Sequence, residues 1–127
     1  MPHFSLHIRE ETLDGTIEPQ LIGALTDAVA AVFGDGARPL VGVELIGVPQ
    51  NRRGSGGVPT DRPDPRVTLS MREAALRLDH VPDATARLIA ATYDALAGVL
   101  GEEIRPRTVV TVVGVPQGSS GAGGELV

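Results

Sequence analysis

The chain carries one pattern of residues twice, which constrains its fold more than any other feature. Gly47-Val48-Pro49-Gln50 recurs 67 positions later as Gly114-Val115-Pro116-Gln117. A repeat of this length corresponds to one supersecondary unit per copy, and such a unit cannot bury its apolar face alone. We therefore expect a single domain of two units, residues 1–60 and 61–127, that share one core.

The spacing of apolar residues predicts the same three elements in each copy. Alternation with a period of two, as in Phe4, Leu6 and Ile8, predicts a strand at the start of each copy. Spacing of three and four residues predicts an amphipathic helix after each strand, and β-branched apolar runs predict a buried strand after each helix. The helices are expected between Pro19 and Gly34 and between Pro82 and Gly101, and the second strands at Val41–Val48 and Thr108–Val115.

This order of elements predicts an α/β fold. A strand, helix and strand in succession form a right-handed parallel crossover. Two such units, related by a pseudo-twofold axis, give a four-stranded mixed sheet with both helices on one face. The strands at 41–48 and 108–115 are apolar on both sides, so the other face of the sheet is expected to be covered by further subunits.

Composition excludes several classes of function. The chain of 127 residues has no cysteine, so disulfides, thiolate nucleophiles and cysteine metal sites are absent. A net charge of -5 argues against nucleic-acid binding, which needs a basic surface. No apolar run approaches the roughly 18 residues of a membrane span, so we expect a cytoplasmic protein without a membrane partner.

The sequence also predicts neither a metal nor a cofactor. His3 and His7 share a strand face, but four residues of strand separate them by roughly 13 Å, too far to hold one metal ion. The run Gly54–Gly57 follows the second strand of its copy, whereas nucleotide-binding glycines lie between a first strand and its helix.

The two ends of the chain carry a family resemblance. The opening Met1-Pro2, followed by a strand, and the closing Gly121-Ala122-Gly123-Gly124-Glu125-Leu126 resemble the tautomerase superfamily. The short members are like 4-oxalocrotonate tautomerase. The fused, two-unit form is more similar to 5-carboxymethyl-2-hydroxymuconate isomerase, malonate semialdehyde decarboxylase and the 3-chloroacrylate dehalogenases. The resemblance implies a homotrimer with a barrel-like arrangement of sheets.

Pro2 is the expected catalytic group. Removal of Met1 would leave a secondary amine at the start of a strand, and all 11 basic residues are arginine, so no lysine competes with it. An apolar pocket disfavours the protonated form of an amine and so favours a base that works near neutral pH. Pro65, the equivalent in the second copy, is locked in a tertiary amide. A Met1 that is retained would remove this chemistry.

Arg72 is the expected partner of Pro2. If the first strands of the two copies run antiparallel, the end of one lies beside the start of the other, which places Arg72 beside Pro2 and Arg9 beside Pro65 as a vestigial second site. Arg72 matches the first of two arginines with which the dehalogenase relatives bind a carboxylate. Surface pairing of Arg72 with an acid such as Glu73 is the alternative.

Three further residues are candidates for substrate contact. Arg53 is expected either to reach a neighbouring subunit's pocket or to lie in solvent, and Arg52 to lie in solvent. His3 is expected to line the sheet or the surface, with substrate contact as the other reading. Together these residues predict proton transfer on a small unsaturated or 2-keto carboxylic acid. A hydratase, dehalogenase or decarboxylase with Pro2 as a general acid, and a ligand-binding protein without catalysis, remain alternatives.

Overall fold

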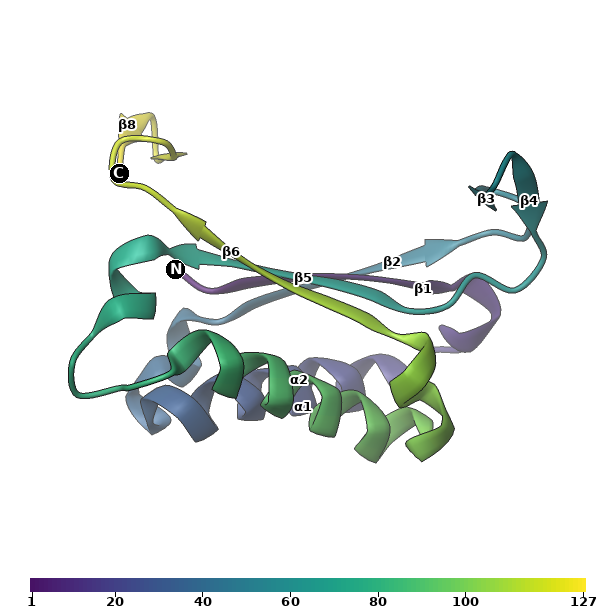
Figure 1. The fold of residues 1–127 in the computed structure, drawn as a ribbon, viewed down its shortest axis with the longest axis horizontal. Helices are drawn as coiled ribbons and strands as arrows, with labels where there is room; N and C mark the ends of the chain where they lie inside the picture. The colour runs from purple at the N-terminus through teal and green to yellow at the C-terminus, as the bar shows by residue number, and fades with distance from the viewer.

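The expected strand, helix and strand occur twice in the structure, a computed structural model that describes residues 1–127 (Figure 1). The first unit contains β1 (His3–Arg9), α1 (Ile17–Phe33) and β2 (Gly42–Val48), and the second contains β5 (Arg66–Arg72), α2 (Ala84–Leu100) and β6 (Val109–Val115). Short 3-10 helices join them: η1 (Glu10–Thr12), η2 (Asp35–Leu40), η3 (Glu73–Arg77) and η4 (Glu102–Arg107).

A glycine-rich hairpin follows each unit. Strands β3 (Arg53–Ser55) and β4 (Val58–Thr60) form the first, and β7 (Gly121–Ala122) and β8 (Glu125–Leu126) form the second. Glycines with positive φ occupy both turns, a conformation that glycine adopts without steric cost. The two hairpins extend from opposite ends of the main sheet (Figure 1).

The main sheet has the mixed topology that the repeat predicted. Its strand order is β2-β1-β5-β6, with parallel pairing inside each unit. Between the units β1 and β5 pair antiparallel, with His3 opposite Ser70 and His7 opposite Arg66. The predicted α/β class, four-stranded mixed sheet and pseudo-twofold arrangement are therefore confirmed. The sheet of one chain is open and does not close into a barrel.

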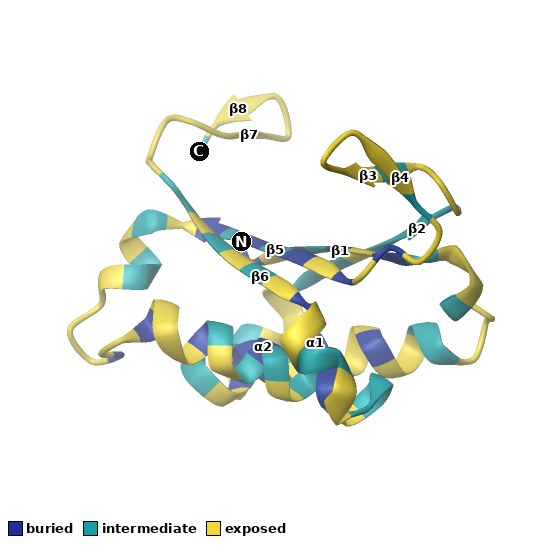
Figure 2. Ribbon diagram, turned by 45° about the vertical axis from the view of Figure 1, so that its right-hand side comes forward, coloured by how far each residue is buried: buried dark blue, intermediate teal, exposed yellow.

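The core lies between the sheet and the two helices, which cover one face (Figures 1 and 2). Alternate residues of β1 and β5 are buried there and meet the apolar stripes of α1 and α2. The period of two in these strands exists because one side chain in two points at the helices. The fully buried side chains include Phe4, Leu6, Leu69, Leu21, Leu25, Leu88 and Leu96.

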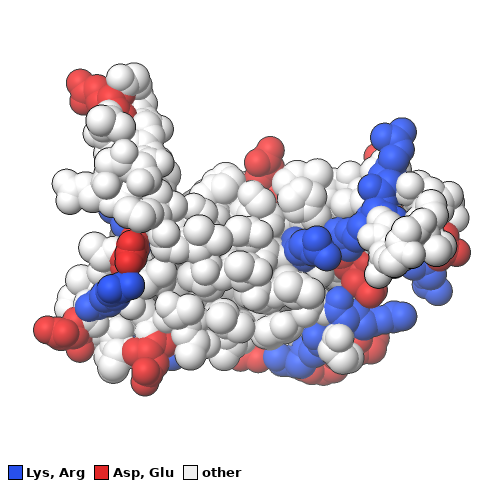
Figure 3. All heavy atoms as spheres, turned by 45° about the horizontal axis from the view of Figure 1, so that its top comes forward, with Lys and Arg blue, Asp and Glu red and all other residues white.

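The other face of the sheet is open and largely uncharged. Its middle carries few ionisable side chains in the space-filling view (Figure 3). On β6, Val109 is 51% exposed and Val113 is 41% exposed. Apolar side chains on a monomer surface mark an interaction surface when they are contiguous, which is why this face was expected to be covered by other subunits.

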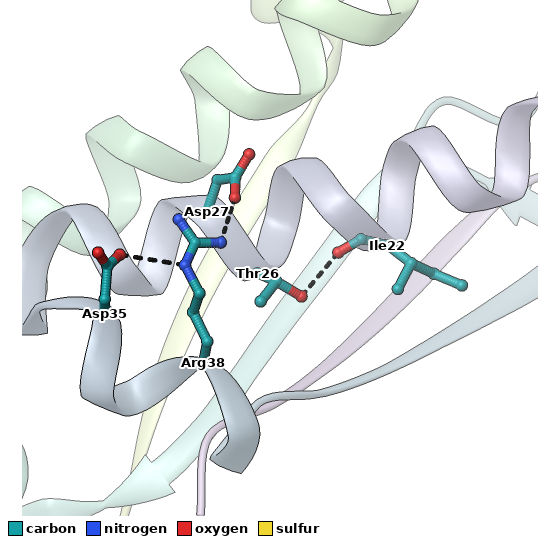
Figure 4. A network of polar contacts seen from close by, with 5 residues as sticks. All are labelled: Ile22, Thr26, Asp27, Asp35 and Arg38. Carbon is teal, nitrogen blue, oxygen red and sulfur yellow. Dashed lines mark hydrogen bonds and ion pairs between the residues drawn. The ribbon is translucent and has the colours of Figure 1, made fainter.

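Two of the 3-10 helices, η2 and η4, are each held by an arginine to the α-helix that precedes them. Arg38 donates to Asp27 on α1 at 2.5 Å and to Asp35 at 3.1 Å (Figure 4). In the second unit Arg105 pairs in the same way with Asp94 at 2.8 Å and with Glu102 at 2.6 Å. The hydrogen bonds that each arginine donates to its carboxylate partners raise the pKa of that arginine, so both guanidinium groups stay charged. We call each of these arginines with its two acids an arginine bracket.

The start of α1 is set by a residue outside the helix. The Asp14 carboxylate accepts hydrogen bonds from the Thr16 hydroxyl at 2.7 Å and from the backbone N–H groups of Thr16 and Ile17 at 2.9 and 3.1 Å. The two N–H groups are unpaired amides at the start of the helix, and the three hydrogen bonds, that of the Thr16 hydroxyl first, lower the pKa of Asp14. None of the helices is both long and apolar enough to cross a membrane.

Candidate active site

The sheet brings Pro2 and Arg72 to the same pocket. Because β1 and β5 run antiparallel with His3 opposite Ser70, the residue before β1 lies beside the end of β5. A pocket of about 330 Å³ opens at this point. It is lined by Met1, Pro2, Val29, Phe33, Ala37, Leu40, Met71, Arg72 and Ala75.

Pro2 is held firmly in this pocket. Its side chain is buried, and its carbonyl oxygen accepts a hydrogen bond of 2.8 Å from the N–H of Gly42 at the start of β2. Met1 is 74% exposed, so the peptide bond that joins it to Pro2 lies where the chain leaves the pocket. The hydrogen bond to β2 and the burial of the ring therefore fix Pro2 at the edge of the sheet.

Arg72 is the cation of this pocket. It ends β5, is exposed, and belongs to none of the ion pairs in the structure. Glu73, the acid considered as its surface partner, pairs with Arg77 at 2.7 Å. The Arg72 guanidinium is thus available to a ligand, and its planar fork suits a carboxylate.

The walls of the pocket come from a segment that the sequence did not single out. Phe33 ends α1, and Ala37 and Leu40 lie in η2, which the Arg38 bracket fastens to α1. Only the apolar spacing at the end of α1 could have indicated them, and that spacing does not distinguish a pocket wall from core. Ala75, from η3, adds a further small apolar side chain to this wall.

His3 is not brought to the pocket. It points to the open face of the sheet, opposite to Phe4, and its Nε2 lies 3.9 Å from a carboxylate oxygen of Glu44. A Cβ at position 42 would lie 2.7 Å from Nδ1 of this imidazole, so a side chain at Gly42 would require His3 to move. Within one chain His3 and the Pro2 pocket lie on different faces, as the reading of His3 as a sheet-lining residue predicts.

Arg53 and Arg52 lie at the other end of the sheet, in the hairpin that follows β2 (Figure 1). Arg53 Nη1 donates to the backbone oxygen of Asp64, and partial burial together with the charge of Arg66 lowers the pKa of Arg53. Arg52 is exposed and forms no ion pair. Neither arginine reaches Pro2 of its own chain.

A second pocket, of about 280 Å³, lies where the pseudo-twofold axis requires it. Pro65 and Arg9 line it in the positions that Pro2 and Arg72 hold in the first. Pro65 is buried, and its oxygen accepts a bond of 3.3 Å from the N–H of Val109, as that of Pro2 does from Gly42. The nitrogen of Pro65 lies in a tertiary amide and has no basic lone pair.

Solved structures identify the class of protein with this fold. No family model matches the chain, and no curated protein matches its sequence. Structures of tautomerase-superfamily proteins do match, over nearly the whole chain, so the expected resemblance to that superfamily is confirmed at the level of the fold.

The particular likeness is to the fused, two-unit form. An asymmetric trimer of a fused 4-OT (4-oxalocrotonate tautomerase) superposes with a TM-score of 0.80 at 23% identity, over 98% of this chain and 94% of that one. A native fused 4-OT gives 0.79 at 25% identity with the same coverage. A member of the cis-3-chloroacrylic acid dehalogenase family gives 0.75 at 16% identity, over 98% and 82%.

Proposed function

We propose that this chain is a tautomerase or isomerase that moves a proton on a small unsaturated or 2-keto carboxylic acid. One observation carries the proposal: Pro2 from the first copy of the repeat and Arg72 from the second line one small, largely apolar pocket. The likeness to fused 4-OT structures supports the same class of reaction.

The proposed chemistry begins with removal of Met1, which turns the Pro2 nitrogen into a secondary amine. Val29, Phe33 and Leu40 surround it with apolar groups, which disfavour the protonated form and favour a base near neutral pH. The Arg72 guanidinium holds the substrate carboxylate through parallel hydrogen bonds. The amine takes a proton from the carbon next to the carbonyl group and returns it to the enol oxygen or to a more distant carbon.

We further propose that the working form is a homotrimer. Fused 4-OT structures of this fold are trimers, and the exposed valines on β6 supply apolar surface for such an interface. In a trimer the β3–β4 hairpin of a neighbouring subunit is the segment that could add an arginine to the Pro2 pocket. Arg52 and Arg53 are the two residues at its start, and Arg53 is already tied to Asp64 of its own chain.

Covalent labelling of the Pro2 amine tests the proposal, and the absence of lysine and cysteine makes such a label specific. A fold neighbour was inactivated by 2-oxo-3-pentynoate, an alkyne conjugated to a ketone and hence an acceptor for amines. With Met1 removed, Pro2 is the only amine in this chain. We expect the intact mass to show loss of Met1 and one inhibitor molecule per chain, on the N-terminal peptide. Retention of Met1, or labelling elsewhere, contradicts the proposal and favours a ligand-binding protein.

Turnover gives the second arm of the test. Phenylenolpyruvate and 2-hydroxymuconate are assayed with wild type and with Pro2→Ala, which replaces the cyclic amine by an ordinary one. The variant keeps an amine at position 2 but loses the ring that orients it, so we expect turnover to fall by up to the roughly 10²-fold that a positioned base contributes. Equal turnover by the two proteins contradicts a role for the proline ring in the acid/base step.

A hydratase, dehalogenase or decarboxylase with the same proline is the second candidate, favoured by the likeness to the dehalogenase-family structure. In that reaction class Pro2 is protonated and acts as an acid. Nitrogen NMR of the Pro2 amine separates the two. A pKa near neutral supports the base, and a pKa well above neutral supports the acid.

A further inference from the structure

The pocket at Pro65 has acquired charges that the pocket at Pro2 lacks. In the repeat Arg107 replaces Leu40 and Thr12 replaces Ala75, and both residues line the Pro65 pocket. Arg62, from the segment between β4 and β5, lines it as well. Three guanidinium groups, the third from Arg9, therefore line this pocket, whereas one faces Pro2. The carboxylates of Asp64 and Glu103 line the Pro65 pocket as well, so the guanidinium groups exceed the acids there by one.

These arginines are only loosely engaged within the chain. The Nε of Arg107 lies 3.8 Å from Asp64, and the Nε of Arg9 lies 3.5 Å from Glu11. Arg62 belongs to no ion pair. Exposed pairs at such separations contribute little to stability, so a bound anion can replace them at small cost.

The positive charge continues beyond the pocket. An adjoining hollow of about 260 Å³ shares Arg62 and Arg107 with it and adds Arg53 and Arg66. Figure 3 shows basic side chains gathered at this end of the molecule, beside the β3–β4 hairpin. Burial, and then repulsion from Arg66, lowers the pKa of Arg53, as expected where positive charges are crowded. In a chain with a net charge of -5 this is a local concentration of positive charge.

We propose that the Pro65 pocket is an anion-binding site that holds a small dianion, either a dicarboxylate or a phosphate, without turning it over. Pro65 has no basic nitrogen, so the chemistry assigned to Pro2 has no equivalent here. Guanidinium forks from three different segments suit a ligand with two negative charges. The duplication has thus given one chain two different pockets, an apolar one with an amine and a cationic one without.

Calorimetric titration with succinate and, separately, with inorganic phosphate tests the proposal, in a buffer of low ionic strength. We expect one site per chain for at least one of the two anions, weakened by added salt. Arg107→Leu, which installs the residue of the first copy, and Arg62→Gln should each weaken binding about tenfold or more, since each removes a charge-assisted contact. The anion that binds identifies the ligand class.

Two matched variants locate the site. Arg72→Gln removes the cation of the Pro2 pocket, so the anion binding that persists in this variant belongs to the Pro65 pocket. Arg87→Gln removes an equal charge at the start of α2 and should bind as wild type does. The proposal is overturned if neither anion binds wild type, if Arg72→Gln abolishes binding, or if Arg62→Gln and Arg107→Leu leave it unchanged. Circular dichroism and thermal melting establish that each variant is folded. If Arg107→Leu does not fold, the binding measured with Arg62→Gln decides the test.

Discussion

Replacement of Arg72 by glutamine tests how the proposed site holds its substrate. The side chain is exposed at the rim of the pocket and has no acidic partner, so its loss disturbs no contact of the fold. Hydrogen bonds to a charged group contribute about 1.5–3 kcal/mol, and a factor of ten corresponds to about 1.4 kcal/mol. Loss of one such contact therefore predicts a fall of roughly 10- to 150-fold in kcat/KM.

Most of this fall in kcat/KM should appear as a rise in KM, with kcat little changed. The carboxylate lies away from the reacting carbon and is bound equally in the ground state and the transition state, so its contact is uniform binding. Arg72→Lys keeps the charge but loses the planar fork, and we expect an intermediate value. Steady-state kinetics with the acid and with its methyl ester complete the design, because the ester should remove the difference between wild type and Arg72→Gln.

Arg87→Gln is the matched control, because it makes the same change of charge near the start of α2, outside the Pro2 pocket. A kcat/KM for Arg72→Gln that equals that of Arg87→Gln would refute the assignment of Arg72 to the substrate carboxylate. If the ratio of kcat/KM between wild type and Arg72→Gln is the same for the methyl ester as for the acid, the substrate carboxylate is not the partner of Arg72.

Three further changes test the assembly and the fold. The proposed trimer should dissociate to monomers when Val113→Asp places a charge on the open face of the sheet, where Val113 is 41% exposed; a trimer of this variant in sedimentation equilibrium would exclude this face as the interface, and a monomeric wild type would refute the trimer. Asp14→Asn removes a carboxylate whose pKa is lowered in the folded state, so wild type should be the more stable protein above about pH 4 and should lose that advantage as pH falls through the lowered pKa, measured by urea unfolding at several pH values. A constant difference across pH would contradict the role of the charge. Tyr93→Phe removes the hydroxyl that donates to the Thr108 oxygen at 2.9 Å, and should lower the free energy of unfolding by about 1 kcal/mol; no change would mean that water replaces this bond.

Much of the fold was predictable because its signals are local. A period of two marked β1 and β5, and helical spacing with nearby proline and glycine marked α1 and α2. The sequence did not predict the four 3-10 helices or the arginine brackets, because Arg38 and Arg105 act through acids on the preceding helix and through chain reversals that no spacing encodes.

The candidate site, too, could be predicted from the sequence only in part. Pro2 and Arg72 could be paired from the repeat, since a pseudo-twofold axis forces the two central strands to run antiparallel. The position of His3 on the opposite face follows from strand alternation. The hairpin arginines could not be placed, because Arg53 is held by the backbone of Asp64, a contact that depends on how β4 leads into β5.

By itself the sequence determined a duplicated strand, helix and strand, a composition without lysine, and the strand face on which each residue lies. All three are properties of composition or of short-range order. Only the tertiary structure decided what surrounds each proline: apolar residues of α1 and η2 around Pro2, and arginines from three segments around Pro65. The reason is that a pocket wall is built from residues distant along the chain, and their meeting is fixed by packing and register rather than by any local pattern.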